Sequence, residues 1–316
     1  MPTPDRIHRF RRDLAALADA DRLAVAVSGG PDSLALLLLA HAALPGRIEA
    51  ATVDHRLRLE NAAEAAHVAA ICADLGIPHA ALSDPDASIA GASVQAQARA
   101  LRYRLLTRWA GERGLRFLAT AHHADDQAET VLMRLARGAG LAGLAGVRAR
   151  RDEREVTILR PLLAWRRAEL AAIVAEAGLE AVDDPSNRSD AYDRTRFRAL
   201  LAGTDLLPAE RLAASAACLA EAGQALAWAA EHEWAKRASR TGETLTLDPS
   251  GLPPELLRRL AARAVSEVRG DAGWRTDKLA ALLPAIVSGG TVNVAGVQIV
   301  GGTAWRFSPE PPRRSV

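Results

Sequence analysis

Apolar and polar positions alternate in blocks along the first two-thirds of the chain. Short apolar runs of strand length are followed by longer stretches with helical spacing, and glycine or proline separates several of them. The runs that predict buried strands are residues 23–27, 48–53, 78–82, 117–121 and 156–163. The stretches that predict helices are residues 7–17, 34–43, 62–75, 93–113, 126–137 and 167–177. Strands that alternate with helices predict an α/β fold with a doubly wound parallel sheet.

The pattern changes after about residue 201. Residues 208–237, 256–268 and 277–287 predict helices, and residues 291–307 alternate as a β-hairpin does. A chain of 316 residues is too long for one average domain and is consistent with two. We expect a domain at residues 1–203 and a smaller, mainly helical domain at residues 204–316 that ends in the hairpin.

A glycine loop, SGGPDS at residues 28–33, separates the first expected strand from the first helix after it. Backbone N–H groups at such a helix N-terminus bind phosphate well. The lysine of the common P-loop is missing, so pyrophosphate is the better candidate, with Asp32 as a magnesium ligand. An ordinary helix cap is the alternative. The candidate nucleotide-binding residues of this loop are Ser28, Gly29, Gly30, Pro31, Asp32 and Ser33.

A second polar stretch, AHHADDQAET at residues 121–130, lies where the fourth expected strand becomes a helix. In open parallel sheets, ligands bind beyond the carboxyl ends of the strands. Asp54, after the second strand, and His122 belong to this edge and are further candidates for nucleotide binding. Asp126 and Glu129 supply carboxylates for metal binding and proton transfer, although their spacing also resembles a capping box. A zinc site is not expected, because no further His or Cys stands at ligand spacing.

The glycine loop resembles the S-G-G-x-D-S signature of the PP-loop pyrophosphatases, which split ATP between its α- and β-phosphates. Further stretches, in the same order, resemble motifs of the tRNA(Ile)-lysidine synthetase family within that superfamily. These are VDHRLR at 53–58, the segment 121–144, RPLL at 160–163, DPSN at 184–187 and RTRFR at 194–198. The resemblance covers roughly the first two-thirds of the chain and implies a Rossmann-like PP-loop domain.

Members of this family adenylate the 2-keto oxygen of the wobble cytidine in an isoleucine tRNA with a CAU anticodon, and free L-lysine then displaces AMP. The resemblance therefore implies a ligase that uses ATP and Mg²⁺, with this tRNA and free lysine as partners. It assigns catalysis to Asp32, Asp126, Glu129 and Arg196, and metal binding to Asp32 and Asp126; for Arg196, a surface arginine cluster is the alternative. Arg137, Arg194 and Arg198 are the candidates for tRNA binding; for Arg137, which adjoins a glycine-rich loop, a solvated charged linker is the alternative.

The chain departs from the family pattern in two places. The family motif R-N-R-I-R has Thr195 in place of its asparagine here. Longer members also carry a further C-terminal domain that is thought to grip tRNA, and residues 208–307 are the candidates for that role here.

The formal net charge is only +2, so charge alone does not indicate a nucleic-acid-binding protein. Cys72 and Cys218 are the only cysteines, and both lie in alanine-rich helical patterns, which favours buried thiols in a reducing compartment. The polar N-terminus lacks a signal peptide, and no apolar run approaches membrane-span length, so we expect a cytoplasmic protein without membrane attachment. The oligomeric state stays open, with a homodimer among the alternatives.

Three other functions compete with lysidine formation. A PP-loop tRNA 2-thiolase generally needs paired cysteines or an iron–sulfur cluster, and the two cysteines here form no C-x-x-C pair. A small-molecule amide synthetase would have no obvious need for the arginine-rich middle segment. A nucleotide-binding regulatory module without catalysis does not need the many carboxylates of residues 121–130.

Overall fold

The computed structural model describes residues 1–54, 60–84, 94–182, 193–271, 274 and 277–311. The family-like stretches at residues 55–58 and 184–187 lie outside these ranges. The chain forms two compact units, Met1–Ala220 and Glu221–Val316.

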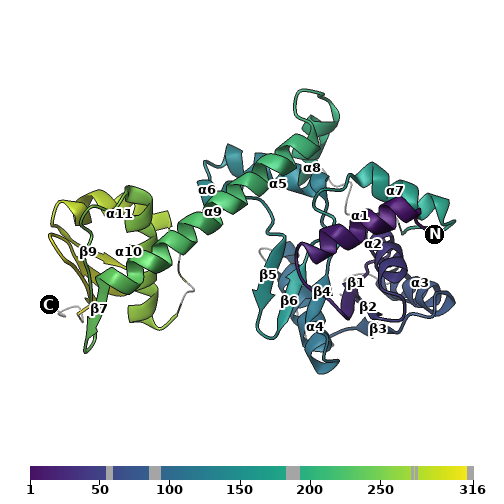
Figure 1. Ribbon diagram of the computed structural model, residues 1–316, viewed down its shortest axis with the longest axis horizontal. Helices are drawn as coiled ribbons and strands as arrows, with labels where there is room; N and C mark the ends of the chain where they lie inside the picture. The colour runs from purple at the N-terminus through teal and green to yellow at the C-terminus, as the bar shows by residue number, and fades with distance from the viewer. Residues whose placement is uncertain (55–59, 85–93, 183–192, 272–273, 275–276, 312–316) are drawn as a thin grey trace. The chain divides into compact units, whose positions relative to one another are not determined.

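The first unit is built on a six-stranded sheet with the order β3-β2-β1-β4-β6-β5 (Figure 1). Five strands are parallel: β1 (Leu23–Ala26), β2 (Ile48–Val53), β3 (His79–Leu82), β4 (Phe117–Ala119) and β6 (Val156–Leu159). The edge strand β5 (Arg150–Glu153) is antiparallel to β6 and was not predicted, because its sequence RRDE is wholly charged. The doubly wound α/β sheet that the sequence predicts is confirmed.

Helices cover both faces of this sheet. One face carries α1 (Pro4–Ala15), α2 (Pro31–Ala43), α3 (Glu60–Asp74) and α7 (Arg167–Glu176), and the other carries α4 (Val94–Glu112). Side chains of a strand point alternately to its two faces. Accordingly, Leu23 and Val25 join the core under α2, whereas Ala24 joins Tyr103 and Leu106 of α4. Helix α2 is buried almost all round, which explains its unbroken apolar run.

Two strand-to-helix transitions at the carboxyl edge of the sheet position the polar residues. Strand β1 leads through the glycine loop into α2, and β4 leads into α5 (Ala124–Ala136). Helix α5 is followed by the short α6 (Leu141–Leu144) and packs against α8 (Asp193–Ala202). Because β1 and β4 are neighbours in the sheet, the two loops that follow them meet.

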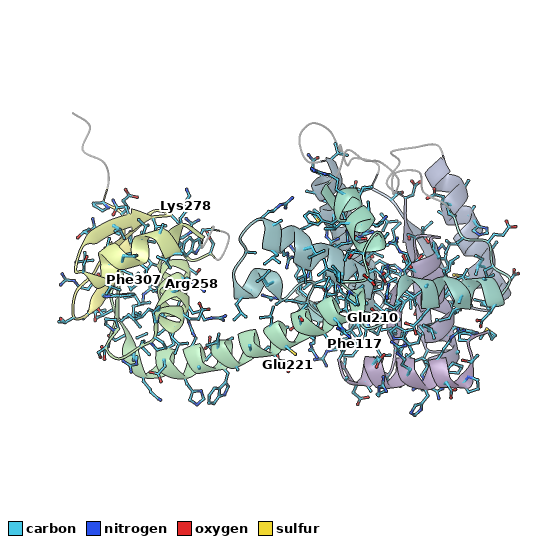
Figure 2. The ribbon with its side chains drawn as sticks, turned by 90° about the horizontal axis from the view of Figure 1, so that it is seen from above. Phe117, Glu210, Glu221, Arg258, Lys278 and Phe307 are labelled. Carbon is cyan, nitrogen blue, oxygen red and sulfur yellow. The ribbon has the colours of Figure 1, made fainter. Side chains whose placement is uncertain are left out.

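The second unit contains α10 (Pro254–Arg269), α11 (Asp277–Val287) and a five-stranded antiparallel sheet with the order β7-β8-β11-β10-β9. The strands are β7 (Ala238–Thr241), β8 (Thr244–Leu247), β9 (Thr291–Val294), β10 (Val297–Val300) and β11 (Trp305–Pro309). The expected hairpin at 291–307 is thus part of a larger sheet. Phe307, labelled in Figure 2, pairs with Ile299 on one side and Leu245 on the other in its core.

Helix α9 (Ala209–Arg237) contains the boundary between the units, at Ala220 and Glu221. The sequence pattern placed a domain boundary earlier, near Gly203. The difference arises because α8 packs on α5, and because Glu210 in the first turn of α9 pairs with Arg166. Both contacts keep the start of α9 with the first unit. Among the described residues, none of the helices combines the length and apolar character that crossing a bilayer requires.

Candidate active site

The glycine loop is shaped by one backbone conformation that favours glycine. Gly29 has a φ of +83°, and a Cβ atom there would lie 3.1 Å from Cγ2 of Val182. Gly30 then caps α2, and Pro31 occupies the first turn, where no intrahelical N–H bond is lost. The two glycines therefore let a ligand approach the backbone N–H groups at the N-terminus of α2, as a phosphate-binding site requires.

Two serines brace this loop from inside. The Ser33 hydroxyl donates to the Gly30 carbonyl oxygen at 2.9 Å and accepts a hydrogen bond from the Ser28 N–H at 3.1 Å. The two hydroxyl oxygens lie 3.2 Å apart. The Ser33 hydroxyl therefore stabilises the conformation of the loop. The loop backbone remains next to the start of α2, where an anion would bind.

His123 joins the glycine loop to α5. It caps α5: the Asp126 N–H donates to Nδ1 at 3.3 Å, and the His123 N–H donates to Oδ2 of Asp126 at 3.2 Å. Its Nε2 lies 3.3 Å from Oδ2 of Asp32, an ion-pair contact that does not reach hydrogen-bond geometry. Burial lowers the pKa of His123, but the carboxylates of Asp32 and Asp126 outweigh it and raise this pKa above its usual value.

Three carboxylates lie near this buried imidazole: Oδ2 of Asp125 lies 3.6 Å from Nδ1 of His123, and two others lie near Nε2. Nε2 of His123 lies 3.3 Å from Asp32 and 3.7 Å from Asp126. The second oxygen of Asp32, Oδ1, is buried and has no hydrogen-bond partner among the described residues. An unpaired buried carboxylate oxygen is costly, and a hard cation such as Mg²⁺ would satisfy it. The described residues form no cluster of three or more His, Cys, Asp or Glu that could hold a metal, so substrate phosphates and water would complete the coordination.

Glu129, one turn further along α5, holds two arginines of α8. Nε of Arg194 donates to Oε2 at 2.7 Å, and Nε of Arg198 donates to Oε1 at 2.8 Å. Arg194 also reaches Oδ1 of Asp126 at 3.0 Å through Nη2. Burial raises the pKa of Glu129, but the hydrogen bonds from Arg198 and Arg194 outweigh it and bring this pKa below its usual value. Glu129 is therefore ionised, 1% exposed, and occupied on both oxygens.

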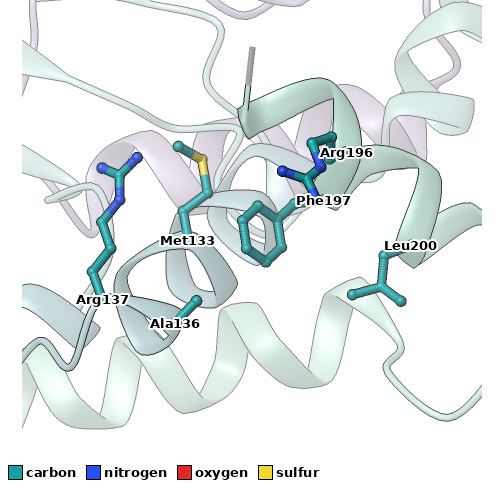
Figure 3. A pocket seen from close by; sticks show the side chains of 6 residues that line it. All are labelled: Met133, Ala136, Arg137, Arg196, Phe197 and Leu200. Atoms are coloured by element: carbon teal, nitrogen blue, oxygen red, sulfur yellow. The ribbon is translucent and has the colours of Figure 1, made fainter. Parts of the chain in front are cut away.

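Arg196 lies apart from this ion-pair cluster. Residues two apart on a helix face different sides, so Arg194 and Arg198 share one face of α8 and Arg196 does not. It lines a pocket of about 400 Å³ together with residues of α5 and α8 (Figure 3). The lining residues are Met133, Ala136, Arg137, Arg196, Phe197 and Leu200.

Two other candidates, His122 and Asp54, lie at the carboxyl edge of the sheet. Nδ1 of His122 lies 3.1 Å from Oγ1 of Thr120. Burial, followed by the charges of nearby arginines, of which Arg160 is the largest contributor, brings the pKa of His122 well below its usual value. Asp54 follows β2, where its N–H donates to the Leu82 carbonyl oxygen at 2.8 Å.

Asp125 has a structural position. It accepts hydrogen bonds from the Arg166 side chain, at 3.1 Å from Nη2, and from the Arg167 N–H at 2.8 Å. It therefore ties the start of α5 to the start of α7.

Sequence reasoning did not single out His123 as the link between the two loops. A signal was available, because a polar residue immediately before a helix, with an acidic residue three positions later, is the spacing of a capping box. What the sequence does not show is that the capping ring also reaches Asp32, on a loop 91 positions earlier in the chain.

Comparisons with known proteins identify the family and the fold of the first unit. Residues 4–204 match a family model described as a PP-loop domain. The fold resembles the U34-tRNA thiolase NcsA from Methanococcus maripaludis, with a TM-score of 0.55 and 19% identity over 67% of this chain and 75% of that one. At this identity the likeness shows the fold alone.

Relatives with higher identity share nearly the whole chain. The tRNA(Ile)-lysidine synthase of Novosphingobium aromaticivorans is 47% identical over 97% of this chain and 94% of its own length. That of Zymomonas mobilis is 44% identical over 93% of this chain and 90% of its own length. A glycine loop at a parallel-sheet edge, the carboxylates and arginines gathered beside it, and this extent of identity place the chain in the tRNA(Ile)-lysidine synthase family of PP-loop proteins.

Proposed function

We propose that this protein joins free L-lysine to the wobble cytidine of an isoleucine tRNA with a CAU anticodon, in a reaction that consumes ATP. The observation that carries this proposal is the meeting of Asp32, His123 and Asp126, because it joins a pyrophosphate-type loop to a carboxylate site. Family membership supplies the substrate class. We place the reaction in the cytoplasm, where tRNA is modified.

The first step is adenylation of the cytidine. The 2-keto oxygen attacks the α-phosphorus of ATP, the bond from that phosphorus to the oxygen bridging to the β-phosphorus breaks, and pyrophosphate leaves. Residues 28–33 would hold the leaving pyrophosphate, because backbone N–H groups at the start of α2 favour negative charge. A carbonyl oxygen is a poor leaving group, and the AMP ester makes it a good one.

The second step is displacement of AMP. The side-chain amine of lysine attacks C2 of the cytidine, the bond from C2 to oxygen breaks, and AMP leaves. The amine has a pKa of about 10.4 in water and must lose a proton to react. Asp126 is the better acceptor, because its side chain is 16% exposed whereas that of Glu129 is 2% exposed. We assign Glu129 to positioning Arg194 and Arg198.

Asp32 and Asp126 would hold Mg²⁺, as the unpartnered buried oxygen of Asp32 suggests. The ion, when bound, neutralises charge on the phosphates of ATP. Around it, the protein's own groups orient the carboxylates: His123 fixes the side of Asp126 that faces the loop, and Arg194 fixes the other side.

Transfer of labelled lysine to a transcript of this tRNA tests the proposal, with ATP and magnesium present and with AMP and pyrophosphate followed in parallel. We expect incorporation that stops when the wobble cytidine is replaced by uridine. Pyrophosphate release without lysine transfer would contradict the proposal and leave the ATP site with another reaction.

A further inference from the structure

The pocket between α5 and α8 combines apolar walls with positive charge. Met133, Phe197 and Leu200 supply apolar surface, and Arg137 and Arg196 lie on either side of the Met133 and Phe197 side chains in the view of Figure 3. None of the described residues that line it is acidic. Arg196 is exposed and forms no ion pair with any other described residue.

This lining selects the chemistry of an occupant. The ammonium group of lysine would meet two guanidinium groups and no carboxylate, which disfavours lysine here. A nucleobase with flanking phosphates fits on both counts, since bases stack on aromatic side chains and arginine binds phosphate. Phe197 is half-buried, so part of its side chain stays accessible to an occupant of the pocket.

The pocket lies close to the proposed active site. Met133 follows Glu129 by four residues on α5, about 6 Å along the helix. On α8, Arg196 and Phe197 come between Arg194 and Arg198, which bind Glu129. The pocket is therefore about one helical turn from the carboxylate cluster, on the same two helices.

We propose that this pocket binds the anticodon adenosine that follows the wobble cytidine, with its base stacked on Phe197 and its backbone phosphate at Arg196. The inference rests on the proposed function, because it takes the anticodon loop as substrate. Single-stranded loops allow neighbouring bases to be splayed into separate sites, so holding this adenosine would help to present the cytidine.

Direct binding of the full-length protein to the tRNA transcript tests the inference without catalysis. The probe is 2-aminopurine in place of this adenosine, whose fluorescence falls when it stacks. We expect quenching with the wild type, little quenching with Phe197→Leu, and a Kd for the transcript about five- to a hundredfold higher for Phe197→Leu. Arg196→Ala should reduce the slope of log Kd against log salt by about one, whereas Arg211→Ala, at an exposed arginine of α9 outside the pocket, should not.

A retained stabilisation of each variant by ATP confirms that it is folded. Equal quenching and equal Kd for wild type and Phe197→Leu would overturn the inference, as would weaker binding with unchanged fluorescence. A raised KM for ATP in Phe197→Leu would overturn it too, because the pocket would then hold the adenine of ATP. Failure of the wild type to transfer lysine would instead overturn the proposed function, and the two failures are therefore distinct.

Discussion

Nε2 of His123, in the capping residue of α5, lies 3.3 Å from Oδ2 of Asp32, in the first turn of α2. Two segments 91 positions apart in the chain thus meet at one imidazole ring. The contact joins the loop that would bind pyrophosphate to the helix that carries Asp126 and Glu129. A change at His123 should therefore separate catalytic effects from folding effects.

Replacing His123 by Asn should lower the rate of pyrophosphate formation at least about tenfold. Asparagine is a good N-cap residue, so α5 keeps its cap, but its side chain is too short to reach Asp32. We expect thermal unfolding within a few degrees of the wild type. Unchanged steady-state kinetics would show that the contact has no part in the reaction.

Gly29→Ala and Gly30→Ala form a matched pair in the glycine loop. Alanine at position 29 must adopt a φ of +83° and approach Val182, whereas position 30 has a φ of −72° and no atom within 3.4 Å of an added Cβ. The first change should cost about 1–2 kcal/mol of folding stability and the second much less. Denaturant unfolding without nucleotide measures both, and equal costs would contradict the loop geometry.

Asp126→Asn should abolish lysine transfer while ATP binding is largely retained, because the amide keeps the shape of the side chain and loses the proton acceptor. Asp125→Asn is the control: Asp125 binds Arg166 and the Arg167 N–H, so its loss should act mainly on stability. Single-turnover lysine transfer and ATP binding by calorimetry separate the two. If ATP binding and turnover fall together in Asp126→Asn, its assignment to chemistry is wrong.

Glu129→Gln should destabilise the protein in a pH-dependent way, by about 2 kcal/mol at neutral pH. The pKa of Glu129 is lowered on folding, so its contribution is present above the unfolded pKa of about 4.3 and is lost as the pH falls through the lower folded value. The gap in Tm between wild type and Glu129→Gln should therefore narrow below about pH 4.3. A gap that is constant from pH 7 to pH 3 would contradict the ionised pairing with Arg194 and Arg198.

A Cys72→Ala, Cys218→Ala variant should keep lysine transfer. Cys72 is buried in the core of the first unit, as expected, and burial raises the pKa of its thiol to about 11. The expectation of a buried thiol is wrong for Cys218, which is exposed on α9. Neither belongs to the site. Loss of transfer in a folded double variant, while pyrophosphate release persists, would contradict this and show that a cysteine takes part in lysine transfer.

Local patterns were sufficient for most of the first unit. Each buried parallel strand is a short apolar run, and helical spacing marks the segments between them, so period and length identify them. Strand β5 failed this test, because an antiparallel edge strand with charged side chains has no apolar run to detect. Strands β7 and β8 were missed although Thr244–Leu247 alternates and Gly242 marks a turn, because β7 follows α9 without a break.

The arginines of α8 show the same division within the candidate site. No helix is predicted over residues 193–202, so it is α8 in the structure that places Arg196 on a different face from Arg194 and Arg198. The sequence also does not show that Glu129 binds Arg194 and Arg198, or that Met133 of α5 and its C-cap residue Arg137 line a pocket with Arg196. Those partners come from another helix.

The α/β class, the glycine loop and the polar residues at the carboxyl ends of the strands follow from local patterns, because each depends on neighbours a few positions away. Which of these residues meet depends on how the folded chain packs. The contact of His123 with Asp32, the burial of Glu129 under two arginines and the pocket beside Phe197 require segments distant in the chain to pack together. Packing of that kind is set by the whole core, and no local pattern contains it.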